Sequence, residues 1–100
     1  MTMRFEWDAE KGRVNRKKHL GISFESAAQV FDDPNLLLRK DWVVEGEQRW
    51  HAIGAARQAV LLVVHVYRKE KDHGDEIIRI LSAREASKRE RRIYIQQAFE

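Results

Sequence analysis

The sequence predicts an α+β fold in which N-terminal helices and a C-terminal helix pack on a curved, mainly antiparallel sheet. Three observations predict it: helical patterns in the first third of the chain, short apolar strand-like runs between residues 36 and 81, and a closing basic segment of helical type. Successive strands joined by tight turns pair antiparallel, and flanking helices cover the sheet as a layer. We therefore expect helices on one face of the sheet and a ligand on the other.

A single domain spanning residues 1–100 is expected, because 100 residues with 43% hydrophobic content supply one core. The net charge of +3 is compatible with an anionic partner without requiring one. The chain has no cysteine, which excludes disulfides and thiol catalysis and fits a cytoplasmic protein. Its longest apolar run, Val60–Val64, is far too short to cross a membrane.

The N-terminal third predicts a short edge strand and a basic helix. Phe5–Trp7 is the strand, and Asp8 is placed to cap a helix that runs through His19 and ends at Gly21. Between Lys11 and His19 the segment carries five basic residues and no acid, so its apolar face is weak. Much of this helix should therefore be exposed.

A second helix should follow at once and face the core. Ser23 is its predicted N-cap, and Asp33-Pro34 should stop it because proline cannot continue the hydrogen-bond ladder. Its apolar residues recur at i, i+3, i+4 and i+7, which places them on one helix face: Phe24, Ala27, Ala28 and Phe31.

The middle of the chain predicts antiparallel strands joined by hairpins. A turn is expected at Glu45-Gly46. The strand segments are rich in β-branched, aromatic and aliphatic residues: Leu36–Leu38 with Trp42–Val44, Gln48–Ala55, Val60–Tyr67 and, after a polar segment, Ile77–Leu81.

Ile77–Leu81 is apolar on both alternating faces except at Arg79, which is typical of a buried central strand. A charge in such a strand requires a partner or a ligand. Ser82 with Glu85 three residues later matches a capping box, so a helix should begin at about Ala83.

The predicted C-terminal helix would carry a cationic face. Arg84, Lys88, Arg91 and Arg92 stand at i, i+4, i+7 and i+8, on one side. This block and the basic segment Lys11–His19 are two positive regions that can converge in space. The alternative is a solvated helix face balanced by Glu85 and Glu90.

His65 interrupts an apolar strand, where an imidazole must be hydrogen-bonded or useful. A satisfied structural histidine is the commoner case, and catalysis by His65 is the alternative hypothesis. Whether His51 shares its face depends on the hairpin loop at Arg57-Gln58, since a one-residue change of register reverses the facing. The four histidines show no recognised metal-ligand spacing, so neither a metal nor another cofactor is expected.

The remaining reactive residue types suit one reaction class. The chain has no phosphate-binding glycine loop, serine elbow or cysteine nucleophile, which leaves Lys, Arg, His and Tyr. This set fits metal-free RNA cleavage. A base removes the 2′-hydroxyl proton, cations stabilise the charge on the phosphorus centre, and an acid protonates the leaving 5′-oxygen.

The chain resembles the BrnT family of toxins from bacterial type II toxin–antitoxin systems, whose fold is similar to that of the RelE ribonucleases. The resemblance extends from Phe5 to Tyr94. It rests on the order and spacing of several short motifs and not on any single one. The matching segments are Phe5-Glu6-Trp7-Asp8, Asn15 with Lys18-His19 and Gly21-Ile22-Ser23-Phe24, Arg49-Trp50 with Ala52-Ile53-Gly54, and Ile78-Arg79-Ile80 with Ser82-Ala83-Arg84 and Glu90-Arg91.

The resemblance implies an endoribonuclease that inhibits translation, a BrnA-type antitoxin, and operator DNA bound through the toxin–antitoxin complex. It implies catalytic or phosphate-binding roles for Lys18, Arg79 and Arg84, to which this sequence adds His65 as a general acid or base. RNA-binding roles are expected for a further set: Arg49, Arg68, Lys88 and Arg91. Leu20 separates Lys18-His19 from Gly21, where other members read Lys-His-Gly directly.

Two other interpretations stay open at this stage. One is a non-catalytic module whose basic patch binds an acidic antitoxin segment or operator DNA, and the other is a degenerate toxin kept as a co-repressor. Lys18 can also be a solvated lysine at a helix end, where it interacts with the helix dipole. Arg84 can likewise be an ordinary exposed helix residue.

Overall fold

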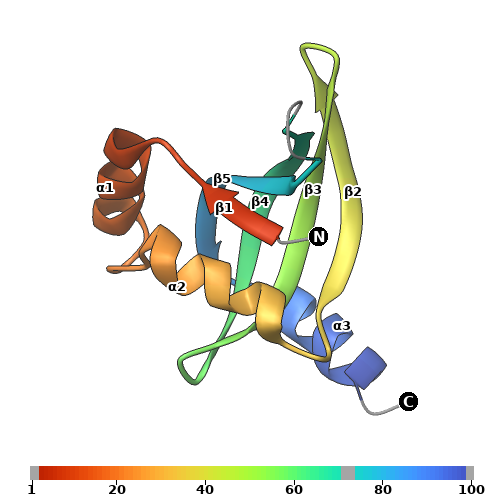
Figure 1. Ribbon diagram of the computed structural model, residues 1–100. Coiled ribbons are helices and arrows are strands. Elements are labelled where there is room, and N and C mark those ends of the chain that lie inside the picture. Colours follow the sequence, from red (N-terminus) through yellow and green to blue (C-terminus); the bar gives the residue numbers. More distant parts are fainter. Residues whose placement is uncertain (1–2, 71–73, 99–100) are drawn as a thin grey trace.

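The computed structural model describes residues 3–70 and 74–98, which form three α-helices, one 3₁₀ helix and five strands (Figure 1). In chain order the elements are β1 (Met3–Glu6), α1 (Ala9–Lys18), α2 (Phe24–Gln29), the 3₁₀ helix η1 (Val30–Asp32), β2 (Leu37–Val44), β3 (Glu47–Ala56), β4 (Ala59–Lys69), β5 (Glu76–Glu85) and α3 (Lys88–Ala98).

The strands form one sheet in the order β1-β5-β4-β3-β2. The pairs β2–β3, β3–β4 and β4–β5 are antiparallel, whereas β1 runs parallel to β5 at the sheet edge. The hairpin turns at Glu45-Gly46 and Arg57-Gln58 have positive φ at both central residues, as two-residue hairpin loops require. The predicted α+β class, the mainly antiparallel sheet and the edge position of the first strand are therefore confirmed.

The two N-terminal helices begin where the sequence predicts. Asp8 accepts from the Lys11 backbone N–H at 3.0 Å and caps α1, and Ser23 accepts from the Ser26 N–H at 3.0 Å and caps α2. Gly21 ends the α1 region with φ of 82° and donates to the Arg16 carbonyl. Because only Gly12 and Asn15 of α1 are buried, its predicted exposure is confirmed.

The main core lies between the sheet and the α2–η1 segment. Phe24, Ala27 and Val30 pack there against apolar side chains of β3, β4 and β5. Gly54 of β3 permits this close approach, because a Cβ at that position would lie 2.7 Å from a Val30 methyl group. The chain thus uses a glycine where the 3₁₀ helix crosses the sheet.

The C-terminal helix packs on the opposite face, which corrects the expectation that all helices share one face. Tyr94 of α3 joins Ile53 and Leu62 in a second apolar cluster, and Figure 1 shows α3 behind the lower part of the sheet, with α2 in front. The Tyr94 hydroxyl donates to the Asp33 carboxylate, and this bond ties α3 to the end of η1. The α3 face of the sheet is therefore partly covered rather than free.

The last strand is longer than predicted, and the expected helix start at Ala83 is wrong. Residues 82–85 pair with β4, Ala83 is buried opposite Val63, and Arg84 belongs to the strand. The capping box forms five residues later. Glu90 accepts from the Ser87 N–H at 2.8 Å, and Ser87 Oγ accepts from the Glu90 N–H at 3.2 Å. Ser82 and Glu85 show the same local pattern, but pairing with β4 keeps that segment extended.

None of the helices within residues 3–70 and 74–98 is long and apolar enough to span a membrane.

Candidate functional site

The two basic segments of the chain meet at the end of β5. Lys18 at the C-terminus of α1 and Arg84 on β5 line one cavity of about 220 Å³, which we call the helix-end cavity. His19 lines it too, together with Leu20, Ile22 and Glu85. A neighbouring cavity of about 260 Å³ also includes Lys18 and His19 and reaches Ser82. The predicted convergence of the two positive regions is confirmed for Lys18 and Arg84.

Asn15 positions this site by joining α1 to the strand edge. β1 pairs with β5 only from Glu76 to Arg79, so beyond that point this edge of β5 has no strand partner within residues 3–70 and 74–98. The buried Asn15 side chain takes that place: its Nδ2 donates to the Ala83 carbonyl at 2.8 Å, and its Oδ1 accepts from the Ala83 N–H at 3.1 Å. The amide also donates to the Ile22 carbonyl at 3.2 Å. It therefore fixes the end of α1 against β5.

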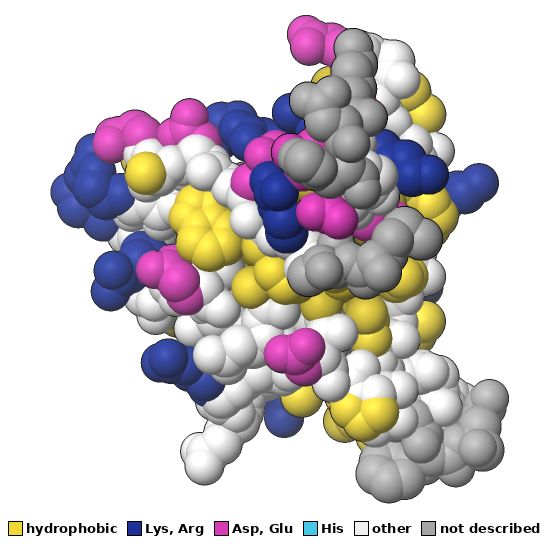
Figure 2. All heavy atoms as spheres, viewed as in Figure 1, with side chains coloured by type: hydrophobic (Ala, Val, Ile, Leu, Met, Phe, Trp, Pro, Cys, Tyr) yellow, Lys and Arg dark blue, Asp and Glu magenta, His cyan; other side chains and the backbone are white. Residues whose placement is uncertain are grey.

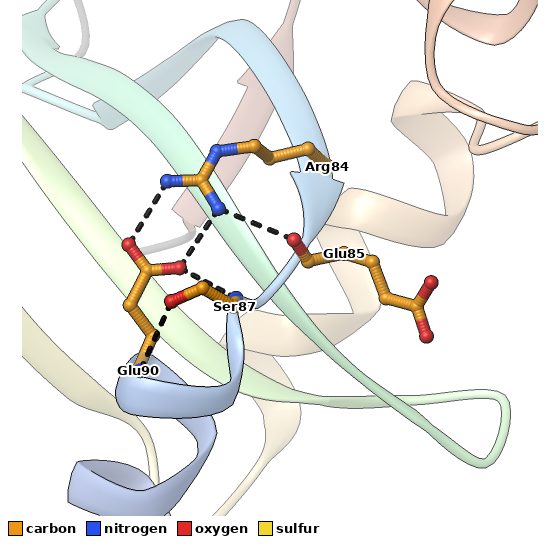
Figure 3. A network of polar contacts seen from close by, with 4 residues as sticks. All are labelled: Arg84, Glu85, Ser87 and Glu90. Carbon is orange, nitrogen blue, oxygen red and sulfur yellow. Dashed lines mark hydrogen bonds and ion pairs between the residues drawn. The ribbon is translucent and has the colours of Figure 1, made fainter.

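Arg84 is held by a carboxylate at the start of α3 (Figure 3). Its Nη1 and Nη2 donate to the two oxygens of Glu90 at 2.8 and 2.9 Å, and Nη1 also donates to the Glu85 carbonyl at 3.2 Å. The hydrogen bonds from Arg84 outweigh burial and lower the pKa of Glu90 to about 2. Its bond to Glu90 in turn raises the pKa of Arg84. Both groups stay charged at neutral pH, and the guanidinium has one fixed orientation.

Four predicted arginines lie on the same face of the sheet. Strand pairing sets Arg84 opposite Leu62 and Arg79 opposite Val66, and alternation along β4 places both pairs on the face that carries α3. Arg68 of β4 and Arg49 of β3 follow the same alternation. We call this surface the arginine face. It joins residues from three strands that are distant in sequence.

Arg79 has the partner that its position in the strand requires. Glu6 of β1 lies opposite it and accepts from Arg79 Nη1 at 3.2 Å. Arg68 bridges from the same Glu6, at 3.7 Å, to Glu47 of β3, at 3.5 Å. These pairs are partly exposed, and surface ion pairs of this kind contribute little to stability. The guanidinium groups are oriented by the pairs while remaining accessible to an anion.

The other predicted cations are spread along the same side. Arg49 is half-buried on β3, next to Trp50. Lys88 and Arg91 of α3 are exposed and line a groove of about 630 Å³ with Arg92, Ile95 and Gln96. The expected shared helix face is confirmed for Lys88, Arg91 and Arg92, but Arg84 is not part of it.

His65 lies away from all these cations. Its side chain is fully buried on the opposite face of the sheet, packed edge-on against the rings of Phe31 and Tyr67. Burial lowers its pKa to about 4, against the opposing effect of the Val63 carbonyl 3.3 Å from Nδ1. The second nitrogen, Nε2, has no hydrogen-bond partner among the described residues. A general acid or base must reach the proton it transfers, so this position does not support catalysis by His65.

His19 is an imidazole to which the sequence analysis assigns no catalytic role. It is half-exposed, directly follows Lys18 and lines both cavities at the end of α1. The available signal was its place beside Lys18 at a predicted helix end. His51 lies opposite Val64 and so on the other face of the sheet from His65, where its imidazole is paired with Asp41 at 3.0 Å. No three or more His, Asp or Glu side chains within the described part of the chain are grouped to hold a metal ion.

The charge on the outer surface of α1 is mixed. Figure 2 shows Lys and Arg side chains gathered over this helix, with Asp and Glu side chains beside them. Arg13 forms an ion pair with Glu10, and both side chains are mostly exposed. Lys18 belongs to none of the ion pairs among the described residues. Its ammonium group is therefore not held in an ion pair within this part of the chain, although the Glu85 carboxylate lines the same cavity.

Comparison with known proteins assigns the family. A search of the curated proteins found no match. The family model described as "Ribonuclease toxin, BrnT, of type II toxin-antitoxin system" matches residues 7–90. This range includes α1, the whole antiparallel part of the sheet and the Arg84–Glu90 pair. The chain therefore belongs to the BrnT family of ribonuclease toxins of type II toxin–antitoxin systems.

Proposed function

We propose that this BrnT protein is a metal-independent endoribonuclease that inhibits translation, with its active site at the helix-end cavity and the adjoining arginine face. The observation that carries the proposal is the convergence of Lys18 and Arg84 on one cavity with His19, although 66 residues separate the two cations along the chain. An ammonium, a guanidinium and an imidazole around one cavity supply charge stabilisation and proton transfer for phosphodiester cleavage.

In the proposed reaction, the scissile phosphate occupies the cavity between Lys18 and Arg84. The imidazole of His19 removes the 2′-hydroxyl proton, and the resulting oxygen attacks phosphorus. Lys18 and Arg84 stabilise the added negative charge, and the 5′-oxygen leaves with a proton from an acid. The products carry a 2′,3′-cyclic phosphate and a 5′-hydroxyl. In this scheme His19 takes the acid–base role that the sequence assigns to His65, because His65 is enclosed in the core.

The pairing of Arg84 with Glu90 supports a positioning role for the carboxylate. A bidentate pair fixes a guanidinium plane, which reduces the rotamer entropy lost when a phosphate binds. Arg79 is oriented by one hydrogen bond to Glu6, and in this proposal it binds a neighbouring phosphate of the RNA. Lys18 and Arg84 at the cavity repel a divalent cation, and Glu85 is the one carboxylate among the described residues that line it, which is too few to chelate such an ion.

The remaining cations extend the proposed RNA path. Arg49 and Arg68 continue the arginine face across β3 and β4, and Lys88 and Arg91 continue it along α3. We further propose a RelE-like fold, a BrnA-type antitoxin and operator DNA bound through the complex, because the family is one of type II toxins. A toxin that acts on RNA during translation works in the cytoplasm, and this is the proposed location.

Cleavage of a defined RNA in EDTA tests the mechanism. The purified protein should cut RNA with the metal chelated and should leave 2′,3′-cyclic phosphate ends. An RNA with one 2′-deoxyribose at the cleaved position should remain intact at that position. Cleavage that requires added Mg²⁺, or that proceeds at the 2′-deoxy position, would contradict attack by the 2′-oxygen. Binding of RNA without cleavage would support a non-catalytic module instead.

A further inference from the structure

The edge strand β2 exposes an unusual apolar surface. Trp42 is 79% exposed and Val43 is 62% exposed, and Leu38 on the same strand is 42% exposed. These residues supply three of the seven large hydrophobic side chains that are exposed among the described residues. Apolar side chains gathered on one edge strand mark an interaction surface more often than single scattered ones do. We call Leu38, Trp42 and Val43 the β2 edge patch. By strand alternation Leu38 and Val43 lie on the face that carries α2 and Trp42 lies on the other face, so a strand added at this edge meets apolar side chains on both of its faces.

The backbone of β2 is available for pairing. In the sheet order β2 is terminal, and its only strand partner among the described residues is β3. The strand is eight residues long and contains no proline, although its register with β3 shifts between Lys40 and Val43. An edge of this kind offers a row of N–H and C=O groups to another extended chain. The apolar patch and the open edge therefore coincide.

We propose that the β2 edge binds an extended segment of the antitoxin, which adds a strand to the sheet. Apolar side chains of that segment pack on the β2 edge patch, and acidic side chains pair with Arg39 and Lys40. A protein partner is implied by the family, because a type II toxin is neutralised by a protein antitoxin. The inference rests on family membership and not on the assignment of the helix-end cavity.

The charge of the β2 edge favours an acidic antitoxin segment over a second copy of the chain as the binding partner. Arg39 and Lys40 are exposed and form no ion pair with the described residues. The chain has a net charge of +3, so two copies joined through β2 would bring like charges together, whereas an acidic segment would neutralise them. RNA fits less well, since Val43 and Leu38 offer nothing to a base edge and a strand edge matches a peptide backbone.

The location also separates this surface from the helix-end cavity. β4 and β3 lie between β5 and β2, which places the two edges roughly 14 Å apart at a strand spacing of about 4.8 Å. An antitoxin strand on β2 would therefore anchor the complex without contacting Lys18 or Arg84. Other parts of the antitoxin would remain free to cover the site.

Binding of the antitoxin encoded in the same operon tests the proposal. Its affinity should be measured by calorimetry for the wild-type toxin and for a Trp42→Glu/Val43→Glu variant, with folding checked by circular dichroism. The matched control is Met3→Glu, which places the same charge at a 49% exposed position on β1, the opposite edge strand. We expect at least a 100-fold loss of affinity for the β2 variant and less than a threefold change for the control. RNA cleavage by the free β2 variant should equal that of wild type.

Hydrogen exchange provides a readout that does not depend on a variant. Amides of β2 should exchange more slowly in the wild-type complex than in the free toxin. Equal affinity of the three proteins together with unchanged β2 exchange would overturn the proposal. Slow β2 exchange with self-association in the free toxin would instead identify a second copy as the occupant. Loss of RNA binding with retained antitoxin affinity in the β2 variant would identify a nucleobase surface, and either result would also overturn the proposal.

Discussion

The side-chain amide of Asn15 hydrogen-bonds both backbone groups of Ala83 and so replaces a neighbouring strand at the edge of β5. This contact joins residues 68 positions apart in the chain. It also explains why Lys18, one helical turn beyond Asn15, lies next to the neighbouring Arg84 in the helix-end cavity. The stability of the fold and the geometry of the proposed site therefore depend on the same buried amide.

Replacing Asn15 by Ala should destabilise the protein by about 2–4 kcal/mol, because the Ala83 N–H and C=O would lose their partners in a buried position. Urea denaturation of the variant measures this change. The control is Asn35→Ala, at an exposed position where only backbone atoms take part in hydrogen bonds. The control should change stability by less than about 0.5 kcal/mol. Equal stability of the two variants would show that the amide is not needed to seal the strand edge.

Replacing Glu90 by Ala should cost about 1–3 kcal/mol of stability, because it removes a capping partner of α3 and the carboxylate that holds Arg84. Glu85→Ala is the matched control. It belongs to the same Ser-x-x-Glu pattern, but its side chain points away from the network in Figure 3. Thermal unfolding should place the Glu85 variant close to wild type. If both variants lose the same stability, the helix does not begin at the Ser87–Glu90 box.

Stability should fall as the pH is lowered from about 6.5 to about 4. Burial lowers the pKa of His65 to about 4, while the unfolded chain retains a value near 6.5. In this window the unfolded state therefore binds more protons, and the loss should reach at most about 3 kcal/mol. Below pH 4.5, protonation of Glu90, whose pKa is about 2, should remove further stability.

The control for this pH dependence is His65→Leu, which keeps an apolar side chain in the core and removes the titrating group. Urea denaturation at several pH values between 4 and 7 should show a flatter profile for this variant than for wild type. An identical slope in both proteins would assign the acid sensitivity to other groups.

Two glycines should respond in opposite directions to alanine. Gly54→Ala should destabilise the protein by about 1–3 kcal/mol, because the new methyl group would overlap Val30 in the core. Gly12→Ala should stabilise it by about 0.5–1 kcal/mol, since Gly12 is inside α1 and its added Cβ would make an ordinary contact with Phe24 at 3.5 Å. Thermal unfolding of the two variants measures both stability changes. Stabilisation by Gly54→Ala would show that η1 can move away from β3.

Local signals in the sequence predicted most of the fold. Asp8 and Ser23 cap their helices because capping depends on residues within one turn, and the strand segments follow from apolar runs between turn residues. The predicted start of α3 was wrong because Ser82-x-x-Glu85 and Ser87-x-x-Glu90 match the same capping-box pattern, and local sequence does not distinguish them. The choice is made by contacts distant in sequence, namely the pairing of Ala83 with Val63 and with Asn15.

The candidate site was predicted less completely than the fold. The resemblance to BrnT toxins supplied Lys18, Arg79 and Arg84, but their arrangement on one cavity and one sheet face requires the strand register. The relation between His51 and His65 could not be derived either. It depends on how β3 and β4 pair across the Arg57-Gln58 turn, which places His65 opposite Trp50 and His51 opposite Val64, on the other face. His19 was missed because no periodic pattern marks a residue that follows a helix.

The most direct test of the proposed active site compares Lys18→Ala with Lys17→Ala in RNA cleavage under EDTA. Both lysines are exposed at the end of α1, but only Lys18 lines the helix-end cavity. We expect Lys18→Ala to lower the cleavage rate about 100-fold or more, as loss of a group that stabilises transition-state charge does, and Lys17→Ala to retain the wild-type rate. Equal rates for the two variants would contradict the placement of the active site at this cavity.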